Sequence, residues 1–188
     1  MKNAIIIHGM PSKDEYLNPL NPSPSHNHWF PWLQRQLILN NILTQTPEMP
    51  TPYEAHYEKW DSVIAQFDVN EETILIGHSL GGGFLVRWLS ENKIKVGRVV
   101  LVAPWLDPNK ELSTGFLDFS IDREFPNRTE DTTIFISHDD DQEELTSFEI
   151  LKEVVVGLKI REFDGKGHFI LEHMATDEFP ELRDYLLQ

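Results

Sequence analysis

The sequence predicts an α/β fold, a three-layer α/β/α sandwich on a mainly parallel sheet of about six strands, with residues 1–188 in one domain. Short aliphatic or β-branched runs recur along the chain with helix-like stretches between them, which is typical of alternating strand–helix units. Several of these runs are apolar without alternation, as expected of strands that helices cover on both faces. The chain is also long enough to bury one substantial core, and no repeat or linker divides it.

In chain order, the strands are predicted at residues 4–7, 42–46, 73–76, 98–103, 132–137 and 158–163, of which 42–46 is the weakest. Between them, apolar residues recur at helical spacing and predict four amphipathic helices. Their stripes are Trp29, Leu33 and Leu37; Trp60, Val63, Ile64 and Phe67; Phe148, Leu151 and Val155; and Phe179, Leu182 and Leu186. We assign these bulky side chains to the core.

Composition narrows the function classes. The chain has no cysteine, so disulfides and a thiolate nucleophile are excluded. Its 31 acidic and 16 basic residues give a net charge of −15, which disfavours nucleic acid and anionic membranes as partners. The apolar run near the N-terminus, residues 4–7, is too short for a signal peptide or a membrane span. We therefore expect a soluble, cytoplasmic protein.

Two irregular stretches follow predicted strands directly, residues 11–27 and 104–131. The loops that leave the carboxyl ends of parallel strands build the ligand crevice of such sheets. Both stretches are therefore candidate pocket walls, although ordinary surface loops fit them as well.

Residues 77–81, Gly-His-Ser-Leu-Gly, match the pattern G-x-S-x-G, in which a tight strand-to-helix turn exposes a serine hydroxyl above the sheet. A predicted strand precedes the motif and an apolar helical run follows it. Gly82 and Gly83, which are costly inside a helix, indicate close packing of that helix on a strand. Ser79 is therefore the candidate nucleophile. An idle serine or a phosphate-binding loop is a weaker interpretation, because the phosphate-loop patterns are missing.

A serine nucleophile needs a general base and a carboxylate that orients the base, and both are expected after the serine in the chain. His168 lies in a glycine-flanked loop after the last predicted strand and is the candidate base, whereas His173 is given a solvated or core-edge role. Three aspartates, residues 139–141, follow the strand at 132–137. This position predicts the acid without choosing among the three, and one of them is expected to cap the next helix. A metal site in this run is disfavoured, because it lacks the spacing of a calcium loop.

The oxyanion of an acyl-transfer intermediate needs two backbone N–H donors. One is expected from Leu80, the residue after the nucleophile, and the other from Met10, in the loop after the first strand. His8 is predicted to be structural. His26 and His28 are a weak metal signal, since no third partner is evident, and we place them in the approach to the helix at Trp29.

These features together resemble the small serine hydrolases of the retinoblastoma-binding protein 9 family, which includes bacterial YdeN-like members. The resemblance covers essentially the whole chain and rests on residues 8–9, 28–33, 77–83, 103–104, 115–119 and 167–169. It implies a minimal α/β-hydrolase without a cap domain and with esterase or amidase activity. Family members read Ser-x-Asp-Asp after the acid-bearing strand with the second Asp catalytic, which selects Asp140. Their Val or Leu followed by Pro is replaced here by residues 142–144, Gln-Glu-Glu, so Asp141 stays a competitor.

We therefore expect a serine hydrolase that cleaves a small-molecule ester, thioester or amide through Ser79, His168 and Asp140, without cofactor or metal. A chain of this length leaves little room for a lid, so a shallow pocket and modest acyl groups are expected. Two alternatives remain open: a non-catalytic protein-binding module on the same scaffold, and an acyltransferase that uses the same triad.

Overall fold

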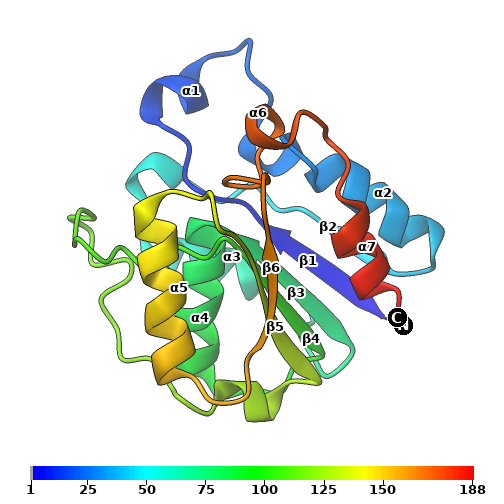
Figure 1. The fold of residues 1–188 in the computed structure, drawn as a ribbon, viewed down its shortest axis with the longest axis vertical. Helices are drawn as coiled ribbons and strands as arrows, with labels where there is room; N and C mark the ends of the chain where they lie inside the picture. Colours follow the sequence, from blue (N-terminus) through cyan, green and yellow to red (C-terminus); the bar gives the residue numbers. More distant parts are fainter. Residues whose placement is uncertain (1) are drawn as a thin grey trace.

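The computed structural model describes residues 2–188, and its six strands form one parallel sheet (Figure 1). The strand order is β2-β1-β3-β4-β5-β6, and every neighbouring pair is parallel. The strands are β1 (Asn3–Ile7), β2 (Leu43–Gln45), β3 (Thr73–His78), β4 (Arg98–Val102), β5 (Asp131–Ser137) and β6 (Lys159–Phe163). The predicted α/β class is confirmed. The strand predicted at 98–103 ends one residue early, because Ala103 has a φ of 44° and turns the chain out of the sheet.

Helices cover both faces of this sheet. They are α1 (Lys13–Leu17), α2 (Phe30–Leu39), α3 (Tyr57–Ile64), α4 (Leu80–Asn92), α5 (Gln142–Val154), α6 (Leu171–Met174) and α7 (Pro180–Leu186). Single 3-10 turns occur at η1 (Pro24–His26), η2 (Pro52–Glu54) and η3 (Phe125–Arg128). None of the helices within residues 2–188 is long and apolar enough to span a membrane.

The core has two halves, one on each face. In β1, Ile5 and Ile7 pack with α3, α4 and α5, whereas Ala4 and Ile6 pack with α2 and α7. This division follows from the alternation of side chains along a strand. Figure 1 shows the resulting layers, with α4 and α5 on one side of the sheet and α2 and α7 on the other. The predicted aromatic residues lie in these two cores, including Trp29 and Trp60, which are fully buried.

The strand order creates a switch point beside β1. The chain runs from β1 outward to β2, then returns to the other side of β1 as β3. Connections that depart in opposite directions leave a crevice at the carboxyl ends of two neighbouring strands, and ligands bind there in open α/β sheets. The loop after β1 contains Met10 and the turn after β3 contains Ser79. The fold thus brings two predicted site residues to the one edge where a crevice is expected.

Candidate active site

Ser79 occupies a strained turn between β3 and α4. Its φ of 53° and ψ of −121° lie where residues with a side chain are rarely found. Four backbone hydrogen bonds hold this conformation. Ser79 N–H donates to Val102 O (3.0 Å), and Ser79 O accepts from the N–H groups of Gly82 (2.9 Å), Gly83 (3.1 Å) and Trp105 (3.1 Å). The backbone of the turn is thereby fixed to the end of β4 and the loop that follows it.

Close backbone packing explains the glycines of the motif. A Cβ atom on Gly77 would lie 2.5 Å from Gly81 O, and a Cβ on Gly81 would overlap the Ile7 carbonyl of β1. Gly83 likewise leaves no room for a side chain, because the Trp105 carbonyl lies against it. The sequence predicted that the helix glycines pack on a strand. The contact at Gly83 is instead with the loop that leaves β4.

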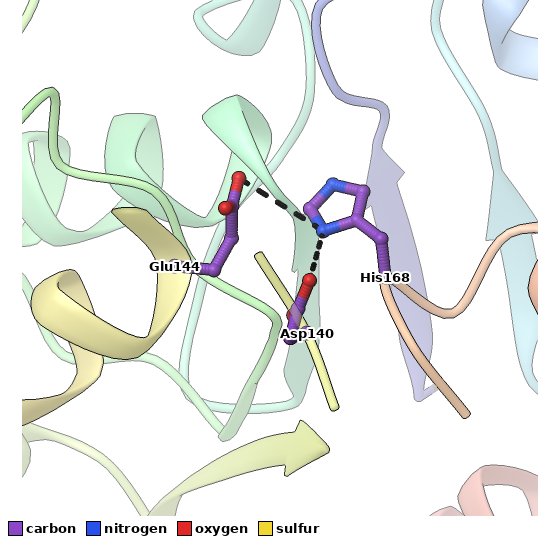
Figure 2. Close-up of side chains that lie close together, drawn as sticks. All are labelled: Asp140, Glu144 and His168. Carbon is purple, nitrogen blue, oxygen red and sulfur yellow. Dashed lines mark hydrogen bonds and ion pairs between the residues drawn. The ribbon is translucent and has the colours of Figure 1, made fainter. Parts of the chain in front are cut away.

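His168 and Asp140 lie side by side in the loops that follow the carboxyl ends of β6 and β5. His168 Nδ1 is 3.0 Å from Asp140 Oδ1, and the Asp140 side chain is fully buried (Figure 2). Burial lowers the pKa of His168, but the hydrogen bond and charge of Asp140, with the charges of Glu144 and Asp141, outweigh it and leave the pKa raised. The geometry therefore favours Asp140 over its neighbours as the residue that orients the imidazole.

The other two aspartates have different surroundings. Asp139 Oδ1 accepts hydrogen bonds from the Ser137 hydroxyl and from the Gly165 and Gly167 N–H groups, and these bonds lower the pKa of Asp139. Asp139 thus ties the loop of His168 to the end of β5. Asp141 stands at the N-cap position of α5, as expected for one of the three, but its side chain makes no capping hydrogen bond.

Further contacts fix the loop that presents His168. The buried His78 ring, the second residue of the serine motif, has its Nε2 2.8 Å from the His168 carbonyl, and Trp29 Nε1–H donates to the Phe169 carbonyl (2.9 Å). His168 N–H donates to Nδ1 of His173 in α6 (2.9 Å). Burial lowers the pKa of His78 well below its ordinary range, so its ring is a neutral donor. The sequence did not reveal the supports from His78 and Trp29, because they join segments about 90 and 140 residues apart.

Ser79 and His168 both line a cavity of about 500 Å³, a volume within the usual range for small-molecule sites, whereas Asp140 lies behind His168 and does not line it. No hydrogen bond links Ser79 to His168 among residues 2–188, although both line the cavity; such bonds often tighten only when substrate binds. Its walls are Met10, Ser79, Trp105, Asp141, Gln142, Glu143, Glu144 and His168. The predicted wall at residues 104–131 contributes Trp105. None of residues 11–27 lines the cavity, so that predicted wall is wrong, and the first turn of α5 lines the cavity instead.

The two predicted oxyanion donors are available. Neither Met10 N–H nor Leu80 N–H donates a hydrogen bond within the described part of the chain. Leu80 is the first residue of α4, where a helix leaves its N–H groups without internal partners. His8 beside them is structural, as predicted: its Nδ1 is 2.7 Å from Gly9 O, and its Nε2 accepts from Met49 N–H (2.9 Å).

Glu144 is a cavity residue that the sequence reasoning missed. It lies in the first turn of α5, only 9% exposed, with Oε1 3.9 Å from His168 Nδ1 (Figure 2). Burial raises the pKa of Glu144 to about 7. The one signal in the sequence was the departure from the family pattern at residues 142–144.

Asp140, Glu144 and His168 also form the one group within residues 2–188 whose ligand atoms lie close enough to share a metal ion, within 4.8 Å of one another. A cation bound there would replace the Nδ1 proton of His168 and force a proton onto Nε2, the nitrogen that the sequence predicts as acceptor of the serine proton. Such a cation would therefore oppose base catalysis. His28 joins no such group, and its Nδ1 accepts from Leu171 N–H (3.2 Å).

Known proteins share this architecture. Residues 20–188 match the family model described as serine hydrolase. The Bacillus subtilis (strain 168) protein YdeN, named as a hydrolase, is 26% identical in an alignment 193 residues long, gaps included. The alignment covers 98% of this chain and 94% of that protein. The crystal structure of YdeN matches with a TM-score of 0.80 and 24% identity, covering 99% and 97% of the two chains.

A YdeN-like hydrolase structure from Pectobacterium atrosepticum shares the fold, with a TM-score of 0.64, 18% identity, and coverage of 99% and 89% of the two chains. The resemblance drawn from the sequence motifs is thus confirmed by the family model and by a relative that spans nearly the full chain. The chain belongs to the serine hydrolase family, with YdeN-like proteins among its relatives.

Proposed function

We propose that this hydrolase cleaves a small ester, thioester or amide through an acyl-enzyme on Ser79, with His168 as general acid–base and Asp140 as the orienting carboxylate. One observation carries the proposal. A strained serine and an imidazole hydrogen-bonded to a buried aspartate line one cavity at the switch point of the sheet.

In the acylation step, Ser79 Oγ attacks the acyl carbon while His168 Nε2 takes the hydroxyl proton. The resulting oxyanion accepts hydrogen bonds from Met10 N–H and Leu80 N–H, the donors that have no partner within the described chain. His168 then gives its proton to the leaving group. Water, activated by the same imidazole, attacks the ester on Ser79 and releases the acid.

The surroundings of His168 support this assignment. An imidazole that accepts the serine proton becomes positively charged, and the raised pKa of His168 reflects an environment that stabilises this charge. The backbone hydrogen bonds of Ser79 offset the cost of its unusual conformation, so the hydroxyl stays positioned before substrate arrives.

Labelling with a fluorophosphonate tests the nucleophile. The wild-type protein is expected to react at Ser79 and the Ser79→Ala variant to remain unlabelled. Hydrolysis of p-nitrophenyl esters of increasing acyl length then measures substrate size, and we expect the short acyl chains to be preferred. A wild-type protein that shows no serine-dependent labelling would contradict the proposal and favour a binding role on the same scaffold.

A second experiment distinguishes hydrolysis from acyl transfer. The free acid should be the main product with or without an added alcohol or amine. If the alkyl ester or amide dominates when the acceptor is dilute, the acyl group is passed to that acceptor and the assignment of water as the second nucleophile is wrong.

A further inference from the structure

No structural contact of Glu144 in the described part of the chain explains why its side chain is buried. Its carboxylate accepts no hydrogen bond from another residue in the described part of the chain, and its close neighbours are His168 and the Asp140 carboxylate, whose ligand atoms lie within 4.8 Å. Its neighbour Glu143 is different, because its two carboxylate oxygens accept hydrogen bonds from Trp105 Nε1 (2.8 Å) and Asn109 Nδ2 (2.9 Å). A largely buried carboxylate that no other residue hydrogen-bonds, with a second carboxylate beside it, is costly and needs an explanation.

Two carboxylates face the same imidazole nitrogen. Asp140 approaches His168 Nδ1 from the loop after β5, and Glu144 approaches it from the first turn of α5 (Figure 2). The Glu144 distance of 3.9 Å exceeds a charge-assisted hydrogen bond by about 1 Å, so the carboxylate must move closer to accept the Nδ1 proton. The N-terminus of α5, a helix of 13 residues, adds a favourable field for a negative charge there.

Asp140 itself is incompletely satisfied. Its Oδ1 accepts from Asp141 N–H (2.8 Å) and faces His168, whereas Oδ2 is buried without a partner. A triad carboxylate is stabilised by the hydrogen bonds made to its second oxygen, and that support is missing here. The Nδ1–H group of His168 therefore faces Asp140, which lies at hydrogen-bond distance (3.0 Å), and Glu144, a second carboxylate 3.9 Å away.

We propose that Glu144 is a second acceptor for the Nδ1 proton of His168, a positioning residue that shares with Asp140 the task of orienting the imidazole. This inference rests on the proposed function. No bond to carbon changes: the proton stays on Nδ1, and only the oxygen that accepts its hydrogen bond differs. The other titratable groups that face the ring are Asp141, His78 and His28.

A double-mutant cycle tests the sharing. Replacing a triad Asp by Asn ordinarily lowers kcat by about 10⁴-fold, because the imidazole takes the wrong tautomer. With Glu144 as a second acceptor, we expect Asp140→Asn to lose only about 10² and Glu144→Gln alone less than about tenfold. The double variant should fall to the full loss of about 10⁴. Equal effects of Glu144→Gln in the two backgrounds would overturn the proposal.

Glu143→Gln is the matched control, since it makes the same chemical change one residue away on the same turn. Added to Asp140→Asn, it should not produce the further collapse that Glu144→Gln produces. A collapse of the same size would show a general effect of charge or packing in the cavity wall and would contradict a specific contact with His168.

Proton NMR gives a readout that does not depend on turnover. An Nδ1–H proton held by a carboxylate resonates far downfield, and we expect this signal of His168 to persist in Asp140→Asn and to vanish in the double variant. Its loss in Asp140→Asn alone would overturn the inference even in an active enzyme. A signal that appears only after EDTA treatment would show that the three groups hold a cation, which also overturns it.

If Asp140→Asn does not fold, the Glu144→Gln variant in the wild-type background tests the role of Glu144 instead. An NMR titration should then give a lower pKa for His168 than in the wild type, whereas Glu143→Gln should leave it within error. Labelling of Ser79 by fluorophosphonate tests the proposed function separately from the role of Glu144. If Ser79 is not labelled, the proposed function fails, whereas the NMR result still tests whether Glu144 contacts His168.

Discussion

Replacing Glu144 by Gln should stabilise the protein at alkaline pH. Burial raises the pKa of this side chain from 4.5 to about 7, so the native state keeps a proton that the unfolded chain releases near its ordinary pKa. Between these two values the native state binds more protons than the unfolded state, and stability falls as the pH rises. Gln keeps the shape and cannot ionise, so it removes this loss.

The size of the effect follows from the shift. Each pKa unit corresponds to about 1.4 kcal/mol, which would give a loss of about 3 kcal/mol above pH 7 if the carboxylate were wholly shielded. Part of the group is in contact with solvent in the cavity, and screening reduces the figure to about 1–2 kcal/mol. For a chain of this size, 1 kcal/mol moves Tm by about 2–4 °C.

Thermal unfolding of the wild type and Glu144→Gln across pH 4 to 9 measures this difference. The two melting curves should coincide near pH 4, diverge between about pH 5 and 7, and stay apart above it with the variant more stable. The control Glu143→Gln should instead be destabilised at every pH by about 1 kcal/mol, because Gln retains one acceptor oxygen for two donors. A gap that does not change with pH, or a less stable Glu144→Gln at pH 9, would refute the reasoning.

Three further changes test the supports of the site. Trp29→Phe leaves the buried Phe169 carbonyl without its donor, so calorimetry should show a loss of about 1–3 kcal/mol and kinetics a lower kcat. Asp139 has a lowered pKa, so its contribution is present above its unfolded pKa and lost as pH falls; Asp139→Asn should flatten the acid side of a Tm–pH plot. Gly81→Ala forces a Cβ into the Ile7 carbonyl, so urea unfolding should show at least about 2 kcal/mol lost, together with weaker labelling of Ser79.

The sheet was predictable because its signal is local. A central strand buried on both faces is a short apolar run whatever its neighbours are, and residues 73–76 and 132–137 are such runs. The motif around Ser79 was predictable for the same reason, since its glycines are required by contacts close to the turn itself. The strand order and the edge at which the loops meet arise from packing between distant segments, which periodicity does not encode.

The choice among the three aspartates could not be derived from position alone. Residues 139–141 are all aspartates that follow one strand, and only the path of the chain gives each a different partner: Asp139 faces the backbone of residues 165–167, and Asp140 faces His168. The family pattern selected Asp140, and the contacts agree with that choice. The same pattern hid Glu144, because a resemblance describes what members share.

The first turn of α5 therefore matters more than its sequence position indicated. Family members usually have an apolar residue and a proline shortly after the acid, whereas this chain has Gln142, Glu143 and Glu144, all of which line the cavity. Glu143 holds Trp105 in the wall, and Glu144 places a costly charge beside the imidazole. Features that reduce stability and face reacting groups are expected at sites of function. The departure from the family is thus concentrated beside His168, the proposed general acid–base.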